Sequence, residues 1–317
     1  MSADMPLVAT RCPFCNSGDI RATVQGTERL YERGGSFEYK VCASCGSLYL
    51  YDRSIDLNAY YPEDYYSYAG TRRPRLQAAA ESFFSRQRAR FVLRLVRAAG
   101  APVDRDAWIL DVGSGAGDLL RAFRSIGFGR VAGIDPYLRA DVDTGGVPVE
   151  RQTIEELAND PRYAGSCAIV MFHHSLEHVF DPAADLDAAR RLLKPGGSIV
   201  VRLPVVNYAW ERYGTCWVGF DAPRHVAIPT ERGMHDVAAR AGLRVARVKY
   251  DSTEIQFVVS EAYERGLTPL KAFPSSPPRT ALRKFLTIPK MLRAAWLNAQ
   301  KRGDQAAFVL RPEDGTC

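Results

Sequence analysis

Most histidines of this chain are concentrated in two short segments, HHSLEH and DAPRH. His173, His174 and His178 lie in the first segment and His225 lies in the second, out of five histidines among 317 residues. Histidine titrates near neutral pH and is the side chain that most often moves a proton in catalysis. This concentration therefore favours a catalytic cluster.

Three interpretations of the cluster remain open. In the first, His174 or His225 acts as a general base, and Arg224 orients an anionic part of the substrate. In the second, four side chains bind a divalent metal that lowers the pKa of a substrate hydroxyl, namely His174, Glu177, His178 and His225. In the third, the LEH sequence is only a cap and packing contact of the following helix.

A glycine-rich segment, ILDVGSGAGDLL, is the second feature that could do chemistry. Gly113, Gly115 and Gly117 alternate behind an apolar run, and Asp111 precedes them. Strand, acidic residue, glycine turn and helix together are typical of a nucleotide-type site at the carboxyl edge of a parallel sheet. The spacing differs from the G-x-G-x-x-G of a dinucleotide site, and an acidic residue ahead of the turn favours a ligand that carries an ammonium group.

A second acidic residue extends this pattern. Asp135 ends the segment VAGIDP, next to Pro136, where a carboxylate would accept hydrogen bonds from both hydroxyls of a ribose. The alternative is a helix cap without a ligand. We expect a nucleoside joined to an amino acid, because one ligand of this kind meets the demands of both carboxylates.

The amino-terminal cysteines form two C-x₂-C pairs, made by Cys12, Cys15, Cys42 and Cys45. Four thiolates at tetrahedral reach are typical of zinc, and a closed set of four protein ligands is structural. A module of about 40 residues could scarcely fold without the metal, so zinc binding and folding should be one event. Seven cysteines in all do not form a disulfide pattern, which favours a reducing compartment.

Hydrophobic periodicity predicts the elements that position these residues. Residues 10–50 indicate a small β module, and residues 75–99 have helical spacing that ends at a glycine and a proline. From residue 107 to 204 strand-like runs alternate with helix-like runs. Such alternation predicts a parallel sheet covered on both faces.

The motifs LDVGSGAGDLL, GIDP, TIEEL, HHSLEHVFDP and LLKPGGSIVVRLP occur in that order. Together they resemble the successive motifs of class I S-adenosylmethionine-dependent methyltransferases, over roughly residues 75–312. The resemblance implies an α/β, Rossmann-like fold with a seven-stranded, mostly parallel sheet whose last strand is antiparallel. It also implies S-adenosylmethionine as cofactor. The expected domains are a zinc ribbon (1–52), a tyrosine-rich linker (53–74) and the methyltransferase domain (75–317) with a basic helical insertion at about 264–303.

The resemblance also implies roles by position. The glycine turn would wrap the methionine part, Thr153 and Ile154 would flank the adenine, and Phe172 and His173 would lie beside the reactive sulfonium. The expected cofactor residues are Asp111, Gly113, Ser114, Gly115, Gly117, Asp135, Pro136, Thr153, Ile154, Phe172 and His173. The expected catalytic residues are His174, Glu177, His178, Arg224 and His225.

The sequence says least about the acceptor of the methyl group. A zinc ribbon joined to this domain resembles bacterial methyltransferases of sugar and polysaccharide pathways, so we expect a sugar, a nucleotide sugar or another small hydroxylated metabolite. Ribosomal-type RNA remains an alternative, as does a non-catalytic cofactor-binding subunit. The histidine cluster also resembles the E-x-x-E-H motif of metal-dependent enzymes that methylate quinols and RNA ends, with His174 in place of the first glutamate. Five tyrosines would either form a lid over the sulfonium or dock the ribbon, namely Tyr60, Tyr61, Tyr65, Tyr66 and Tyr68.

The net charge of +6 is unevenly distributed. Nine Lys or Arg residues and no acidic residue lie from Arg265 to Arg302, so the rest of the chain sums to −3. This segment could meet nucleic acid, an anionic membrane surface or a phosphorylated substrate. The alternative is a solvated helix whose apolar residues pack inward, namely Leu282, Phe285, Leu286, Leu292 and Trp296. No stretch approaches the roughly 20 apolar residues of a membrane span and no signal segment is evident, so we expect a cytoplasmic protein.

Overall fold

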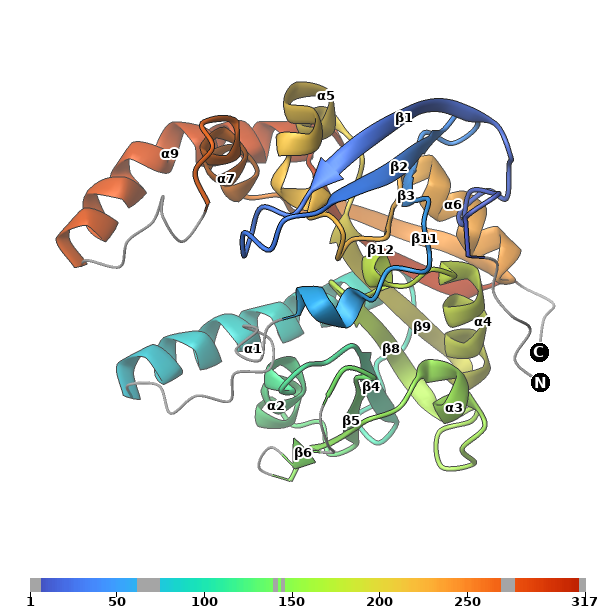
Figure 1. The fold of residues 1–317 in the computed structure, drawn as a ribbon. Helices are drawn as coiled ribbons and strands as arrows, with labels where there is room; N and C mark the ends of the chain where they lie inside the picture. The colour runs from blue at the N-terminus through green and yellow to red at the C-terminus, as the bar shows by residue number, and fades with distance from the viewer. Residues whose placement is uncertain (1–6, 62–74, 139–141, 144–145, 269–276, 314–317) are drawn as a thin grey trace.

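The computed structural model describes residues 7–61, 75–138, 142–143, 146–268 and 277–313. Its main sheet has eight strands in the order β11-β12-β9-β8-β4-β5-β7-β6 (Figure 1). The strands are β4 (Trp108–Val112), β5 (Val131–Ile134), β6 (Val142–Asp143), β7 (Pro148–Glu150), β8 (Cys167–His173), β9 (Leu193–Pro204), β11 (Leu243–Tyr250) and β12 (Gln305–Pro312).

The pairing in this sheet confirms the expected mostly parallel topology. The strands β7, β5, β4, β8 and β9 pair in parallel, and β12 runs antiparallel between β9 and β11. The two-residue strand β6 adds an eighth strand at the edge beside β7, which the sequence did not predict. Because the carboxyl ends of β4, β5, β7, β8 and β9 meet at one edge, their following loops are brought together there.

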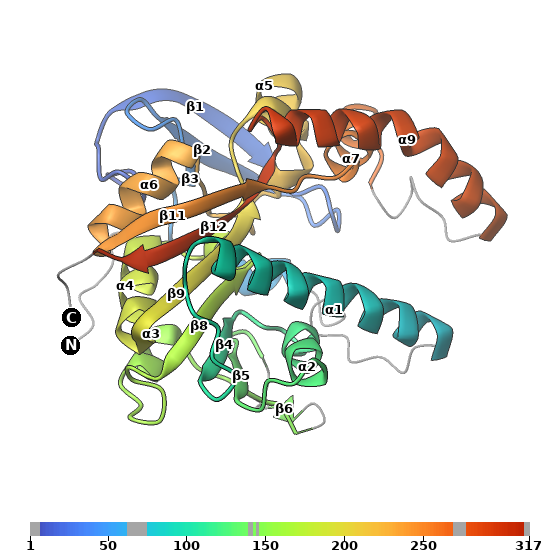
Figure 2. The same cartoon turned by 180° about the vertical axis from the view of Figure 1, so that it is seen from behind.

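Both faces of the sheet are covered, as the near-continuous apolar runs of the parallel strands require. Alternate residues of β8 point to opposite faces, so Ile169 and Met171 pack with α1 (Arg75–Ala98) and α2 (Asp118–Ser125). Val170 and Phe172 join the other core cluster, which includes residues of α3 (Ile154–Ala158), α4 (Pro182–Leu192) and α6 (Glu231–Arg240). Figures 1 and 2 show the two layers from opposite sides.

The amino-terminal β module shares a sheet with the larger domain. Its strands β1 (Ile20–Thr27), β2 (Ser36–Cys42) and β3 (Leu48–Leu50) form an antiparallel sheet, and β3 pairs with β10 (Ala227–Ile228) of the larger domain. One core cluster runs through both parts, and the ring of Tyr39 in β2 lies 4.6 Å from that of Phe220. The β module is thus packed into the fold and is not an appendage.

The LEH sequence, which one interpretation made a cap of the following helix, forms a separate 3-10 turn, η2 (Leu176–His178). Helix α4 begins at Pro182, where Asp181 caps the amide of Ala184 and proline occupies the first turn. Proline at that position needs no amide partner, which explains why the helix begins there. Because α4 begins only at Pro182, the histidine segment lies in an irregular loop at the carboxyl end of β8.

The basic insertion expected at about 264–303 lies between β11 and β12 and contains α9 (Pro277–Ala299), whereas α7 (Ile255–Glu264) precedes it. The prediction that Leu292 and Trp296 pack inward is wrong, because they are 67% and 58% exposed. Helix α9 instead contacts the domain through the opposite face, where Ala294 and Leu297 are buried. Three further expected inward residues, Leu282, Phe285 and Leu286, lie outside the side chains that the structure describes. Within the described ranges, no helix combines the length and apolarity needed to cross a membrane.

Candidate active site

The glycine turn connects β4 to α2. Gly113, Gly115 and Gly117 all have positive φ, at 72°, 51° and 75°. A Cβ built on Gly113 would lie 2.5 Å from the Cβ of Ser175, in the histidine segment, so no larger residue fits there without displacing that segment. The Ser175 hydroxyl donates to the Val112 carbonyl at 2.6 Å. The glycine turn and the histidine segment are therefore in direct contact.

Two buried carboxyl groups flank this turn. Asp111 is 3% exposed and Asp135 is 4% exposed. Burial, and then the nearby charge of Asp135, raises the pKa of Asp111 to about 8. Burial also raises the pKa of Asp135, although hydrogen bonds from the amides of Tyr137 and Gly115 oppose that effect. Asp111 Oδ1 and Ser114 Oγ are buried without a hydrogen-bond partner among the described residues.

Asp135 is held by the backbone on both sides. Its Oδ2 accepts from the Gly115 amide at 3.0 Å, and its Oδ1 accepts from the Tyr137 amide at 3.0 Å. The ring of Tyr137 stacks on that of Tyr61 with centroids 5.4 Å apart. Each carboxylate oxygen retains a lone pair for a further donor, so this carboxylate can still accept bonds from a ligand.

Three residues expected to line the cofactor have side chains that are engaged within the fold. Thr153 caps α3 in a reciprocal capping box with Glu156. Ile154 and Phe172 are 3% and 1% exposed and belong to the core. Their backbones still lie just after β7 and at the end of β8, and their proposed contacts with the cofactor stay predictions.

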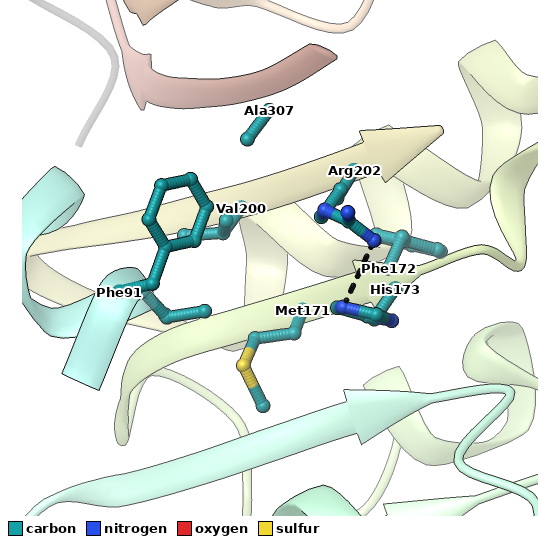
Figure 3. Close-up of a pocket in the computed structure, with 8 residues that line it drawn as sticks. Phe91, Met171, Phe172, His173, Val200, Arg202 and Ala307 are labelled. Atoms are coloured by element: carbon teal, nitrogen blue, oxygen red, sulfur yellow. Dashed lines mark hydrogen bonds between the residues drawn. The ribbon is translucent and has the colours of Figure 1, made fainter. Parts of the chain in front are cut away.

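A small pocket lies beneath α1, lined by Phe91, Val92, Met171, Phe172, His173, Val200, Arg202 and Ala307 (Figure 3). Figure 3 shows the His173 ring beside Arg202, whose Nη1 lies 3.5 Å from His173 Nε2. Burial, followed by the electrostatic effects of the neighbouring His174 and Arg202, lowers the pKa of His173 well below its ordinary value. The imidazole of His173 is therefore neutral near neutral pH.

His174 has both ring nitrogens engaged. Arg202 Nη1 donates to His174 Nε2 at 2.6 Å, because a guanidinium can only donate. The proton of this imidazole is thus on Nδ1, which donates to Glu177 Oε1 at 3.3 Å. His174 also has a positive φ of 58°, which a non-glycine residue rarely adopts. His174 is well placed to orient Glu177 and has no ring nitrogen free to act as a base.

In His178 and His225 the hydrogen-bond partners lie at Nδ1, whereas both ring nitrogens of His174 are engaged. His178 Nδ1 lies 2.8 Å from the Arg224 carbonyl, and His225 Nδ1 lies 2.9 Å from the Gly219 carbonyl. A carbonyl only accepts, so both histidines carry their proton on Nδ1 when neutral and have a lone pair on Nε2. The two rings lie 4.8 Å apart, edge to face.

Glu177 lies between these histidines with its side chain fully buried. Burial would raise the pKa of Glu177, but the hydrogen bond from His174 and the nearby His178 and His225 outweigh it and lower the pKa to about 2. Burial, and then His225, lowers the pKa of His178 to about 4. His225 Nε2 lies 3.9 Å from Glu177 Oε1 and 3.9 Å from Asp221 Oδ2. The anionic carboxylate of Glu177 thus lies near the neutral imidazole of His178.

The geometry also modifies the expected metal set. Glu177, His178 and His225 have potential ligand atoms within 4.8 Å of one another, and Glu177 Oε2 is buried without a hydrogen-bond partner among the described residues. His174 is not part of this group. Three side chains, and not the expected four, could therefore hold a divalent ion here.

Arg224 does not face an acceptor, contrary to the sequence prediction. Its side chain is fully buried and donates to Asp221 Oδ1 at 2.6 Å and to Glu28 Oε1 at 2.9 Å. A third bond reaches the Tyr60 carbonyl at 3.1 Å. Arg224 therefore connects the β module to the loop of His225, and its charge is already compensated.

The comparison with known families decides the identity of this fold. A methyltransferase-domain family model matches residues 84–248, which is more than half of the chain. The chain belongs to the methyltransferase domain family. Residues 84–248 thus form a methyltransferase domain on a class I, Rossmann-like fold.

Relatives of this methyltransferase include ubiquinone biosynthesis O-methyltransferases. The protein from Marinobacter nauticus is 42% identical over 100 residues, which cover 29% of this chain and 42% of the relative. That from Paraburkholderia xenovorans is 32% identical over 136 residues, which cover 41% of this chain and 56% of the relative. The chain thus spans about half the length of these relatives. A solved S-adenosylmethionine-dependent methyltransferase from Archaeoglobus fulgidus has a TM-score of 0.43 and 15% identity, over 72% of this chain and 93% of the other.

The four cysteines of the β module come together in the methyltransferase. Cys12 Sγ lies 3.6 Å from Cys45 Sγ, Cys15 Sγ lies 3.5 Å from Cys42 Sγ, and all four sulfurs lie within 4.8 Å of one another. None of the four is in a disulfide. Tetrahedral zinc with bonds of about 2.3 Å needs sulfurs about 3.8 Å apart, so this donor set fits zinc.

Several residues of the site were missed by sequence reasoning. Arg202 fixes His174, the Tyr61 hydroxyl lies 2.9 Å from the protonated Nδ1 of His178, and Tyr39 donates to the His225 carbonyl at 2.9 Å. The tyrosine-rich linker signalled Tyr61 only as a lid or a docking contact. The other linker tyrosines, Tyr65, Tyr66 and Tyr68, lie outside the described residues.

Proposed function

We propose that this methyltransferase transfers a methyl group to a hydroxyl oxygen of a small acceptor, with His225 as the general base. The observation that carries the proposal is the lone pair of His225 Nε2, with the carboxylates of Glu177 and Asp221 each 3.9 Å away. A base at this position takes its proton beside two carboxylate groups.

The residues around the glycine turn fit S-adenosylmethionine. Asp111 Oδ1 and Ser114 Oγ are polar atoms without partners among the described residues, as expected where a ligand supplies them. Asp111 and the turn from Gly113 to Gly117 would hold the methionine part, and Asp135 would hold the ribose. When bound, the cofactor supplies a methyl group on a positively charged sulfur.

The protein's part in the reaction is to orient the acceptor and to accept its proton. The Gly219 carbonyl keeps the proton of His225 on Nδ1, so Nε2 is the atom that takes the hydroxyl proton. His178, whose pKa is lowered to about 4, stays neutral and adds no repelling charge. His174 holds Glu177 in place through its own bond with Arg202.

Two contacts support placing the cofactor crevice next to this base. Ser175 packs against Gly113 on one side. On the other side, Tyr61 stacks on Tyr137, next to Asp135, and its hydroxyl lies 2.9 Å from His178 Nδ1. A ligand held by Asp111 and Asp135 would thus lie beside the histidine loop.

A phenolic or quinol-type acceptor is the class that we favour. A phenol has an ordinary pKa of about 10, which a neutral imidazole can deprotonate during the reaction, whereas aliphatic hydroxyls are far weaker acids. The relatives named above are ubiquinone biosynthesis O-methyltransferases, whereas the expected sugar acceptor finds no support among them. Because the chain spans about half of these relatives, the acceptor is proposed here and not transferred from them.

A metal-assisted reaction is a second candidate, favoured by the unpartnered Glu177 Oε2 beside two imidazoles. A site with two imidazoles suits softer divalent ions better than Mg²⁺. Such an ion would lower the pKa of the acceptor hydroxyl at the position where His225 otherwise takes its proton.

The test is incubation of the purified enzyme with labelled S-adenosylmethionine and separate pools of catechols and hydroquinones, nucleotide sugars, and RNA. Label in the phenolic pool, retained after treatment with a chelator that leaves the cysteine site loaded, supports the base mechanism. Loss of this activity on chelation and recovery with a divalent ion supports the metal-assisted reaction. Label that enters only the sugar or RNA pool overturns the proposed acceptor class.

We also propose that Cys12, Cys15, Cys42 and Cys45 bind structural zinc. The donor set is closed, since all four positions of a tetrahedral ion would be filled by protein sulfurs, which leaves none for substrate. The ion would stabilise the β module, whose contacts with Arg224 and His225 hold the site. Its role in catalysis is therefore indirect.

A further inference from the structure

Helix α9 is apolar on two opposite faces. Ala294 and Leu297 are each 1% exposed and pack on the domain. Ile288, Leu292 and Trp296 follow one another at four-residue spacing and are 44%, 67% and 58% exposed. Four-residue spacing places these three side chains on one face of the helix. Leu297 follows Ile288 by nine residues, which is two and a half helical turns, so the buried Leu297 lies on the opposite face. The helix therefore presents an apolar stripe away from the domain.

A solvated helix normally has polar residues on its outward face. Met291, adjacent to this stripe, is 49% exposed as well. Scattered exposed apolar residues need no explanation, but a contiguous stripe of large ones marks a surface that is covered in use. We name this surface the α9 stripe, defined by Ile288, Met291, Leu292 and Trp296.

Helix α1 has a similar feature. Phe83 and Phe84 are 50% and 61% exposed, and their rings contact each other edge to face. Figures 1 and 2 both show α1 and α9 extending from the same side of the molecule. The two long helices that extend from this side of the molecule thus both carry exposed apolar side chains.

The charge of these two segments is strongly positive. The segment from Arg265 to Arg302 has nine Lys or Arg residues and no acidic residue, and α1 has six Arg residues and one Glu. Together they carry a net charge of +14, so the remainder of a chain with a net charge of +6 sums to −8. Arg90, Arg94 and Arg97 of α1 are exposed, as is Arg293 of α9.

We propose that the α9 stripe and Phe83–Phe84 dock this enzyme onto an anionic lipid bilayer surface. A helix that combines Lys and Arg with outward Leu, Ile, Met and Trp side chains is suited to lie in the plane of the headgroups. The positive segments are attracted to anionic lipid, and the apolar side chains enter the boundary with the acyl chains. Trp296 has the amphipathic ring that such an interface accommodates.

Two other occupants fit these residues less well. Nucleic acid would be attracted by the charge, but its phosphates and base edges offer no place for Ile288 and Leu292. A second copy of this chain would cover the apolar stripe but would bring two strongly positive segments together. A bilayer satisfies both the charge and the apolar surface.

This placement also relates the bilayer to the site. Phe91, about two helical turns beyond Phe83, lines the pocket beneath α1 that contains His173. The helix proposed to touch the membrane therefore reaches the region of the histidines. The docking surface does not depend on the proposed acceptor, because it rests on α1 and α9 alone.

The experiment is vesicle co-sedimentation of the full chain with phosphatidylcholine vesicles, with and without phosphatidylglycerol. The test variant is the double substitution Leu292→Ser and Trp296→Ser, and the matched control is Ile20→Ser, which changes a 46% exposed apolar residue of β1 in the other sheet. All three substituted side chains are exposed, so thermal melting should be unchanged and any loss of binding is not a loss of folding.

We expect the natural chain and Ile20→Ser to bind the anionic vesicles, and the double variant to bind at least tenfold more weakly. Binding should also weaken as salt rises. Failure to bind anionic vesicles, equal binding to both vesicle types, or unchanged binding of the double variant overturns the proposal. So does tight RNA binding that survives the double substitution, or a dimer in sedimentation velocity that the double substitution dissociates. None of these outcomes bears on methyl transfer to a soluble acceptor, which is assayed separately.

Discussion

The buried carboxyl of Asp111 should make cofactor binding strongly dependent on pH. Burial and the charge of Asp135 raise the pKa of Asp111 to about 8, so the carboxyl is mostly protonated in the free enzyme at neutral pH. The ammonium group of the cofactor would favour the ionised carboxylate and lower this pKa on binding. Binding near neutral pH must therefore release the proton of Asp111.

The size of this effect follows from the pKa. A group with a pKa of about 8 is about nine-tenths protonated at pH 7, so binding should release about 0.9 proton there. If only the carboxylate binds, the association constant should rise about ninefold from pH 6 to pH 7. The sign follows from the raised pKa, since lowering the pH stabilises the protonated form that does not bind the ammonium group.

Titration calorimetry in two buffers with different ionisation enthalpies measures the proton release directly. The range from pH 6 to 7 is suitable, because an α-amino group has an ordinary pKa of about 7.7–8.0 and stays charged there. Asp111→Asn should weaken binding and abolish the proton release. Asp185→Asn is the control, because burial and its acidic neighbours raise the pKa of that carboxyl to about 7 and its titration could mimic the effect.

Two results would refute this reasoning. One is a natural enzyme that binds the cofactor at pH 7 with no net proton release. The other is an Asp111→Asn variant that releases as many protons as the natural enzyme, which would assign the titration to another group. Loss of the proton release in Asp185→Asn, but not in Asp111→Asn, would show that the titrating carboxyl is Asp185 of α4 and not Asp111 before the glycine turn.

Further predictions concern the base, the metal and the contact between the two sheets. His225→Ala should lower kcat by a factor of about 10² to 10⁴ and leave the cofactor dissociation constant unchanged, and retention of kcat would exclude His225 as the base. Removal of zinc, verified by metal analysis, should abolish hydrogen-exchange protection in residues 10–50, and a protected module without metal would contradict the zinc assignment. Glu28→Gln should lower the free energy of unfolding in urea by about 3 kcal/mol, because it leaves the buried Arg224 without one carboxylate, and a loss below about 1 kcal/mol would show that Asp221 suffices. Tyr61→Phe removes the hydroxyl beside His178 and should change kcat without changing the free energy of unfolding. Both quantities are measured on the same preparation, and an unchanged kcat would contradict a role of Tyr61 in positioning His178.

Much of the fold could be predicted because its signals are local. The alternation of apolar runs along residues 107–204 reflects strands buried on both faces, and those strands form a parallel sheet. The helix expected over 75–99 is α1 at Arg75–Ala98, since its periodicity ends at a glycine with positive φ. The start of α4 was less predictable, because a capping aspartate and a proline four residues further on outweighed the LEH sequence.

The candidate site could be predicted in its residue types but not in their roles. The sequence left His174 and His225 as alternative bases, and only their partners in the structure distinguish them. Arg202 engages the second nitrogen of His174, whereas a carbonyl group leaves Nε2 of His225 free. The sequence could not show that Arg224 is paired inside the protein and does not face an acceptor, because its partner Glu28 lies 196 residues away in the chain.

The sequence by itself determined the class of this protein. The spacing of the glycines and acidic residues predicts a close approach of backbone and ligand, and the spacing of the cysteine pairs predicts a metal site, so both predictions could be made from short segments. The tertiary structure decided which histidine has a free lone pair, that the cysteine module shares a sheet with the catalytic domain, and that the basic helix presents apolar side chains outward. These properties depend on contacts between residues far apart in the chain, and such contacts exist only once the core has brought the segments together.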